Sequence, residues 1–370
     1  MFKLYRLKNF HFQLIIYLSL LTIIGIKVIG SASPSDQKKQ IFGFVLGLVV
    51  MLVISVIDYR YFVRFGWIYY LFSFVMLLLV KVAGKVVGGS RRWLVIPGIN
   101  FQFQPSEFVK ILLILFFAYF FMKYQEKINT VKILPLSLVL IAIPLAFILM
   151  QPELSTSIVV AFIFVTLLFI AGLSYKIILT VLGIVIPIIV IGISYMSTHT
   201  EQLAEIYQFR RFMAWRYPND SRWAELALHQ HNSIMAIGSG QLWGKGLNNS
   251  VATSMNNSNF IIEPQTDFIF AVLGEELGFA GSLTIIILLI LIILECINIA
   301  RTAKDLSGRL ICCGMAALIG FQSFVNISVA SGIMPNTGIP LPFVSYGLTS
   351  LVSLFAGMGF VLNIGLQPKK

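Results

Sequence analysis

Long, continuous apolar runs separated by mostly short polar connections are the main pattern of this chain. A helix needs about 20 mostly apolar residues to cross a hydrocarbon layer roughly 30 Å thick, because each residue rises about 1.5 Å. The runs do not alternate between apolar and polar positions, so they predict helices rather than the strands of a β-barrel. The runs are 14–29, 41–57, 67–82, 105–121, 133–150, 156–173, 177–195, 267–297, 310–330 and 342–365. They predict an all-α polytopic membrane bundle of about ten transmembrane helices.

Two stretches depart from the pattern of apolar runs and short polar connections. Residues 197–266 predict a large extracellular loop between the seventh and eighth spans, and their aromatic residues and glycine-rich turns favour an ordered, functional loop. Residues 331–347 contain three prolines and three glycines, which exclude one regular helix. Irregular backbone at membrane depth persists only when protein buries it or when it lines a wet cavity, so this stretch predicts a re-entrant outer segment. No other boundary is visible, and residues 1–370 are expected to form a single membrane domain.

Composition and charge support this interpretation. The chain is 58% hydrophobic and 11% charged, with a mean hydropathy of +0.90, which a water-soluble domain of this length would not bury. The net charge of +12 comes largely from Lys and Arg in alternate connections, and this bias predicts cytoplasmic termini and an extracellular 197–266 loop. Basic residues do not cluster with aromatic residues in a soluble domain, so nucleic acid is not an expected partner, whereas membrane lipids are.

Glu107 and Lys110 are candidates for function because ionisable groups inside a membrane segment are costly. They lie three residues apart at the start of the fourth predicted span, on one helix face, where they can pair. These residues alone favour a structural pair between helices and a functional pair equally.

Asp267 begins the eighth predicted span, directly after the long loop. An Asp at a helix start is often only a cap, stabilised by exposed N–H groups and the helix dipole. The same environment keeps the carboxylate ionised and able to accept a proton or orient a cation. One carboxylate is not a metal site by itself, so a need for Mg²⁺ or Mn²⁺ stays open, with Asp267 as the candidate ligand.

Two arginine pairs lie on the predicted outer side, one in a short connection and one in the long loop. They are Arg91 with Arg92, and Arg210 with Arg211. Guanidinium groups bind diphosphates through paired hydrogen bonds, and they suit lipid head groups equally well. The pairs therefore indicate an anionic ligand at the outer face. No Walker motif is present in the sequence, so an ATP-driven pump is not expected.

Several short motifs follow one another along nearly the whole chain. They are Arg92-Trp-Leu, Phe103-Gln-Pro-Ser-Glu-Phe-Val-Lys110, Gln151-Pro-Glu-Leu, Ala236-Ile-Gly-Ser-Gly, Thr266-Asp-Phe-Ile-Phe-Ala, Glu275-Glu-Leu-Gly and Gly338-Ile-Pro-Leu-Pro-Phe-Val-Ser-Tyr-Gly347. In order and spacing they resemble the SEDS family of bacterial shape, elongation, division and sporulation proteins. Glu153, Ser155 and Leu348 stand where that family more often has Asp, Gly and Gly, which leaves the subfamily and the shape of the outer cavity open.

The resemblance implies a peptidoglycan glycosyltransferase that polymerises lipid II on the extracellular face of the bacterial cytoplasmic membrane, beside a class B penicillin-binding protein as transpeptidase. It implies that Asp267 is the essential acid, which takes the proton of the incoming 4-hydroxyl directly or through a cation while undecaprenyl diphosphate leaves. The candidates for holding the diphosphate are Arg92, Arg211 and Lys110, with Glu107 as the partner of Lys110 and Arg210 as a less secure match. Pro340, Ser345 and Tyr346 are expected in the cavity wall.

Two other classes of function remain open from the sequence. A lipid II flippase would have a similar bundle, but it needs a polar path through the full depth of the membrane, whereas the candidate residues gather in the outer half. A non-catalytic scaffold for a cell-wall synthase would retain its function after Asp267→Asn. The sequence does not distinguish a role in elongation from one in division or sporulation.

Overall fold

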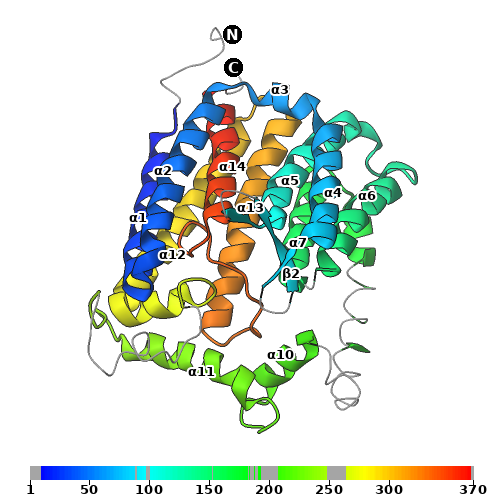
Figure 1. Cartoon of the computed structure of the whole chain (residues 1–370). Coiled ribbons are helices and arrows are strands. Elements are labelled where there is room, and N and C mark those ends of the chain that lie inside the picture. The colour runs from blue at the N-terminus through cyan, green and yellow to red at the C-terminus, as the bar shows by residue number, and fades with distance from the viewer. Residues whose placement is uncertain are drawn as a thin grey trace.

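A computed structural model of the chain describes residues 10–87, 90–96, 101–151, 153–181, 183, 187, 191–192, 207–247 and 264–367. Helices dominate these ranges (Figure 1). They are α1 (Phe12–Ala32), α2 (Pro34–Val56), α3 (Tyr59–Arg64), α4 (Gly66–Ala83), α5 (Pro105–Lys123), α6 (Ile133–Leu149), α7 (Leu154–Ile170), α10 (Tyr207–Arg216), α11 (Ala224–Ser239), α12 (Ile269–Thr302), α13 (Leu306–Ala330) and α14 (Leu348–Leu366), with a 3₁₀ turn at Gln125–Lys127.

Within the described ranges, seven helices are long and apolar enough to cross a membrane: α1, α2, α4, α5, α12, α13 and α14. Two more apolar helices, α6 and α7, are shorter. The predicted seventh span, 177–195, lies mostly outside the described residues. The all-α polytopic bundle predicted from the sequence is confirmed. The tenth helix starts at Leu348 rather than at 342, because the preceding residues belong to an irregular segment.

The bundle has two different ends. Helix α1 begins, α14 ends and α3 lies at the upper end of the bundle in Figure 1, which we call the terminal end. The opposite end, called here the loop end, carries α10 and α11 from the predicted 197–266 loop. Residues 331–347 lead from the loop end of α13 back into the bundle, to the start of α14.

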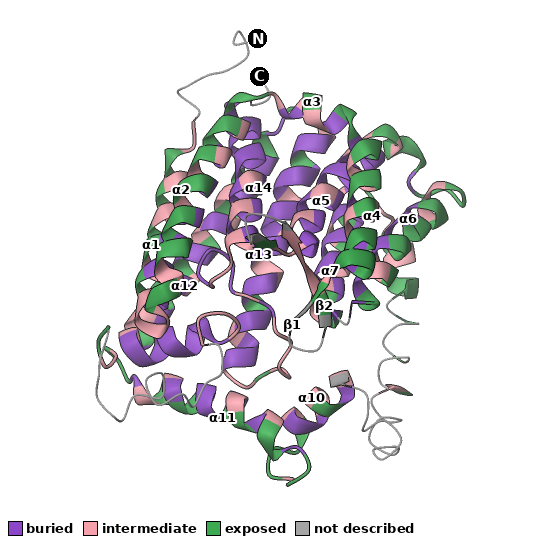
Figure 2. Cartoon of the chain, in the orientation of Figure 1, coloured by how far each residue is buried: buried purple, intermediate pink, exposed green. Residues whose placement is uncertain are grey.

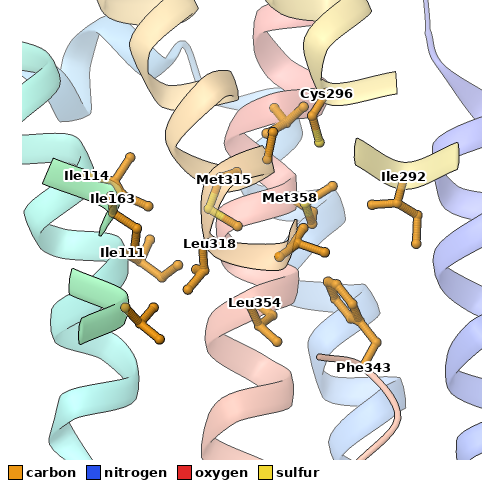
Figure 3. Close-up of a cluster of buried hydrophobic side chains, with 14 of the residues drawn as sticks. Ile111, Ile114, Ile163, Ile292, Cys296, Met315, Leu318, Phe343, Leu354 and Met358 are labelled. Atoms are coloured by element: carbon orange, nitrogen blue, oxygen red, sulfur yellow. The ribbon is translucent and has the colours of Figure 1, made fainter. Parts of the chain in front are cut away.

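Helices α5, α13 and α14 form the centre of the bundle and are buried around most of their circumference (Figure 2). Their aliphatic and sulfur-containing side chains interlock in the core, as Met315, Leu354 and Met358 do in Figure 3. Helices α2 and α4 instead turn many large apolar side chains outward, which is the pattern of surfaces that face lipid. Small residues allow close helix packing: a Cβ at Gly47 of α2 would lie 2.6 Å from the Phe355 ring of α14.

A small antiparallel sheet between α4 and α5 was not predicted. It consists of β1 (Lys85–Val87), β2 (Ser90–Ile96) and β3 (Phe101–Phe103), in that order, with Lys85 opposite Trp93 and Leu94 opposite Phe103. Aromatic and β-branched residues favour strands, but these runs are too short to give a clear pattern. The sheet determines where Arg92 lies.

Helix α12 is broken at Gly278, whose φ of 65° and ψ of −163° are not helical. A strap formed by residues 240–246 packs over the break. Main-chain N–H groups of Lys245 and Gly246 each donate to a helix carbonyl at 2.9 Å, while Phe279 and Ala280 donate back to the strap at 2.8 and 3.1 Å. The strap therefore supplies hydrogen-bond partners that the broken helix lacks, which membrane depth requires.

Side chains anchor the strap to the broken helix. Lys245 Nζ lies 2.7 Å from Glu275 Oε1, and the Glu275 side chain is only 1% exposed. Ser31 of α1 donates a hydrogen bond to Glu276. Both buried glutamates of the broken helix therefore have side-chain partners.

Candidate active site

Residues 331–347 are all described, and none of them is helical. Their main-chain carbonyl groups accept hydrogen bonds from side chains of the surrounding helices. The donors are Trp215 to Gly332 (2.9 Å), Gln230 to Met334 (2.7 Å), Arg211 to Asn336 (3.3 Å), Ser155 to Thr337, Asn326 to Ile339 (2.7 Å), Gln322 to Pro340 (3.1 Å) and Gln40 to Ser345 (3.1 Å). Protein side chains thus replace the helical hydrogen bonds, as irregular backbone at membrane depth requires.

The turn that carries Asp267 is bound to this segment through three consecutive carbonyl groups. Tyr346 N–H donates to Gln265 at 2.9 Å, Ser345 Oγ donates to Thr266 at 2.7 Å, and Asn326 Nδ2 donates to Asp267 at 2.8 Å. The structure thereby places Ser345 and Tyr346, two predicted wall residues, beside the predicted catalytic residue.

Asp267 lies one residue before the helix cap rather than at it. Helix α12 begins at Ile269, with Phe268 in the N-cap position and no side-chain cap hydrogen bond. The side chain of Asp267 is partly buried. A capping role at the N-cap position, one of the two possibilities that the sequence left open, does not describe this geometry.

Gly338 brings Asp267 and Arg211 together. A Cβ at this glycine would lie 3.2 Å from Oδ2 of Asp267 and 3.6 Å from Nη1 of Arg211, so the two charged groups flank one point of the segment. The φ of Gly338 is +74°, in the left-handed region that glycine adopts without steric cost. A carboxylate and a guanidinium that meet across a bare backbone can act on one ligand together.

The structure separates the two loop arginines. Both belong to α10, but Arg210 is exposed, whereas Arg211 donates to the carbonyl of Asn336 at 3.3 Å. The stronger sequence match of Arg211 therefore agrees with its position, and Arg210 is not brought to Asp267 by any contact that the structure describes.

The predicted pair on α5 is present. Lys110 Nζ lies 2.8 Å from Glu107 Oε1, and both side chains are at least 94% buried. Lys110 also donates to Gln322 Oε1 at 3.3 Å. The second oxygen of Glu107, Oε2, has no hydrogen-bond partner among the described residues. The pairing is confirmed, while the role of the pair in function remains a prediction.

Arg92 of β2 contacts the residues directly before α7. Its Nε donates to the carbonyl of Gln151 at 3.3 Å and lies 3.8 Å from Glu153 Oε1. Gln104 donates to the same Glu153 oxygen at 2.6 Å. Burial raises the pKa of the Glu153 carboxyl, and the Arg92 guanidinium opposes that rise. Glu153, which departs from the usual motif, is therefore the direct charge partner of Arg92.

The sequence interpretation missed the neutral amides around the site. Gln322 and Asn326 lie in a predicted apolar span and carry no charge, so the cost of burying ionisable groups does not single them out. Their signal was available, because two amides four residues apart share one helix face. In the described ranges, His, Cys, Asp and Glu side chains do not gather in groups of three that could hold a metal ion without a ligand's help.

Known proteins resemble this chain over almost its full length. A family model for cell cycle proteins of the FtsW, RodA and SpoVE type matches residues 2–370. The peptidoglycan glycosyltransferase MrdB of Escherichia coli strain K12 is 38% identical over 362 residues, which cover 96% of this chain and 93% of MrdB. A probable peptidoglycan glycosyltransferase FtsW of Geobacter sp. strain M18 is 31% identical over 383 residues, with coverage of 98% and 99%.

Solved structures resemble the fold as well. A chain from work described as "Structural coordination of polymerization and crosslinking by a peptidoglycan synthase complex" superimposes with a TM-score of 0.78 at 27% identity, covering 96% of this chain and 97% of the other. The rod shape determining protein RodA of Thermus thermophilus gives a TM-score of 0.68 at 27% identity, with 96% coverage of both chains.

Proposed function

The chain belongs to the FtsW, RodA and SpoVE family of cell cycle proteins, and we propose that it is a peptidoglycan glycosyltransferase that polymerises lipid II into glycan strands. The observation that carries this proposal is the meeting of Asp267 and Arg211 at Gly338. Glycosyl transfer is also the activity in the names of the relatives MrdB and FtsW. At least 93% of the length of each relative aligns with this chain.

In the proposed reaction, Asp267 accepts the proton of the 4-hydroxyl of the incoming sugar. The freed oxygen attacks the anomeric carbon of the donor, and the bond from that carbon to the diphosphate breaks. The electron pair leaves with undecaprenyl diphosphate, whose charge Arg211 helps to stabilise. Direct displacement inverts the anomeric centre and needs no covalent enzyme intermediate. Proton removal by a positioned carboxylate contributes about 100- to 10,000-fold to the rate.

Arg92 and Lys110 are the further cations proposed for the diphosphate. Each already has a carboxylate partner, Glu153 at 3.8 Å and Glu107 at 2.8 Å. Fixed partners hold such cations in place before the ligand arrives, so little reorganisation is needed as charge develops on the leaving group. Arg210 is exposed and is assigned no role at the reacting atoms.

We further propose that Asp267 is the residue that would bind a divalent cation, Mg²⁺ or Mn²⁺, during the reaction. The donor set fits this limited role, because Mg²⁺ is commonly bound by one or two carboxylates together with substrate phosphates. The cation would supply charge stabilisation at the diphosphate. The neighbouring carbonyl groups of Thr266 and Asp267 already accept hydrogen bonds, so they are less available as ligands.

The proposed orientation has the loop end outside the cell and both termini in the cytoplasm of a bacterium. Basic residues at the terminal end support it through the positive-inside bias. They are Arg60, Arg64, Lys123, Lys127, Arg301, Lys304 and Arg309. Asp267 then lies near the extracellular face, where lipid II would be polymerised.

A class B penicillin-binding protein is the proposed partner. The similar chain from the peptidoglycan synthase complex supports it, since that assembly is described as coordinating polymerization and crosslinking. A transpeptidase beside the loop end would receive new strands where they form.

The test is glycan polymerisation from purified lipid II, with the partner included where needed. Asp267→Asn should lower the rate about 100- to 10,000-fold at equal folded protein. Asp305→Asn is the matched control at the terminal end, where Asp305 caps α13 and accepts from Tyr59 at 2.7 Å. Asp305→Asn should lower stability and keep the rate per folded molecule.

Absence of polymer from the wild type, combined with passage of lipid II across vesicle membranes, would replace this proposal with a flippase. Full function of Asp267→Asn in cells would favour a scaffold.

A further inference from the structure

Helix α13 presents two buried amide side chains, one turn apart, toward the candidate site. Gln322 is 0% exposed and Asn326 is 1% exposed. Uncharged amides in a helix that crosses a membrane still cost free energy unless their hydrogen bonds are made. Their contacts therefore show what they hold in place.

Asn326 joins the Asp267 turn to the 331–347 segment. Its single Nδ2 group donates to the carbonyl of Asp267 at 2.8 Å and to that of Ile339 at 2.7 Å. Ile339 directly follows Gly338, which approaches the Asp267 carboxylate. One amide thus fixes the backbone of Asp267 and the surface that its carboxylate faces.

Gln322 extends this connection toward α5. Its Oε1 accepts from Lys110 at 3.3 Å, and its Nε2 donates to the carbonyl of Pro340 at 3.1 Å. Because Pro340 follows Ile339, the two amides hold adjacent carbonyl groups of the segment. Lys110, the segment and Asp267 are therefore linked through one face of α13.

We propose that Asn326 is a positioning residue for glycosyl transfer, and that Gln322 links Lys110 to the same frame. This inference rests on the proposed function of Asp267. Asn326 does not contact the reacting atoms. It sets the angle and depth at which the Asp267 carboxylate meets the incoming hydroxyl, and displacement of about 1 Å can lower an enzymatic rate about 100-fold.

Asn363 provides a matched control far from the site. This asparagine of α14 is also buried, donates to the carbonyl of Ser55 at 2.7 Å, and accepts from the N–H of Tyr59 at 2.9 Å. It lies at the terminal end. Loss of either asparagine leaves buried main-chain groups unpaired, but only Asn326 is bound to Asp267.

The experiment compares Asn326→Leu with Asn363→Leu in the full chain, with lipid II varied to give kcat and KM. Both variants should unfold at lower temperature. Asn326→Leu should lower kcat about 10- to 100-fold with KM within about twofold, because proton transfer depends on the placement of the carboxylate. Asn363→Leu should retain the wild-type kcat per folded molecule. Equal kcat for the two folded variants would overturn the inference.

Asn326→Ser keeps the test decisive if the leucine variant does not fold. A serine hydroxyl is shorter and donates only one hydrogen bond, so it cannot hold both carbonyls. Its kcat should lie between those of the wild type and the leucine variant, or clearly below the wild type if it is measured alone. A wild-type kcat in Asn326→Ser would contradict a positioning role.

Gln322→Glu tests the link to Lys110 separately. The carboxylate retains an acceptor for Lys110 but has no amide N–H to donate to Pro340. We expect kcat to fall about 2- to 10-fold, the effect of one hydrogen bond. An unchanged kcat would remove Gln322 from the frame and leave Asn326 in it. Lack of polymer from the wild type would instead refute the proposed function itself, so the two failures are distinguishable.

Discussion

Polar side chains that are buried or half-buried serve the two ends of the bundle in different ways. At the terminal end they complete regular structure: Asp305 caps α13 through the N–H of Gly308 at 2.8 Å, and Asn363 ties α14 to the end of α2. At the loop end, side chains such as Asn326 and Gln322 bind carbonyl groups that belong to no helix. The terminal end would retain much of its backbone geometry from helix propensity alone, whereas the loop end depends on its neighbours for its shape.

The largest expected contrast concerns the ion pairs of the two ends. Lys245→Met leaves the 1%-exposed Glu275 without its cation and should destabilise the protein by about 3 kcal/mol, within the range for a broken buried pair. Arg60→Met breaks a pair at the terminal end whose Arg60 is 35% exposed, and it should cost about 1 kcal/mol or less. Thermal unfolding in one detergent measures both. Equal losses would mean that the strap is no more dependent on charge pairing than the terminal end.

A smaller contrast separates neighbouring arginines on α10. Arg211→Gln removes the cation beside Asp267 and should lower the polymerisation rate on the order of 10-fold to 100-fold, the value of a hydrogen bond to a charged group. Arg210→Gln changes an exposed side chain and should leave the rate within about twofold, as surface substitutions usually do. Initial rates at saturating lipid II make the comparison. A larger effect at Arg210 would move the diphosphate site to the other face of α10.

The smallest contrast uses two glycines with positive φ. Gly338→Ala and Gly172→Ala both place a side chain in the left-handed region, which costs about 1–2 kcal/mol in stability. A Cβ at Gly172 would have no neighbour within 4 Å, whereas one at Gly338 would lie 3.2 Å from the Asp267 carboxylate. Unfolding temperatures should therefore fall similarly, while only Gly338→Ala lowers the polymerisation rate. Similar rates in the two variants would show that the Asp267 carboxylate moves away from the added methyl group without loss of activity.

Features set by local rules were predictable from the sequence. The length of the apolar runs predicted the helices, and the spacing of three residues between Glu107 and Lys110 predicted their ion pair. The proline and glycine content of 331–347 gave the absence of helix there. Each of these follows from neighbouring residues, without knowledge of which helices pack together.

Features set by contacts distant in sequence were not predictable. The break at Gly278 lies inside an apolar run that reads as continuous helix, and it depends on the strap from residues 240–246. The double hydrogen bond of Asn326 joins groups on two other segments, so the shared helix face of Gln322 and Asn326 does not identify the carbonyl groups that Asn326 binds. The meeting of Arg211 with Asp267 likewise needs the return of α10 over the end of the bundle.

The 331–347 segment is held mainly through its main-chain carbonyl oxygens. Every amino acid has such a carbonyl group, whatever its side chain. The side chains that determine the conformation of this segment therefore belong to other elements, namely α2, α7, α10, α11 and α13. Transplanting the segment alone into a relative would carry over its side chains without its conformation. Conversely, evolution is free to exchange side chains such as the exposed Ile333 and to alter what the wall recognises, while the wall itself keeps its form.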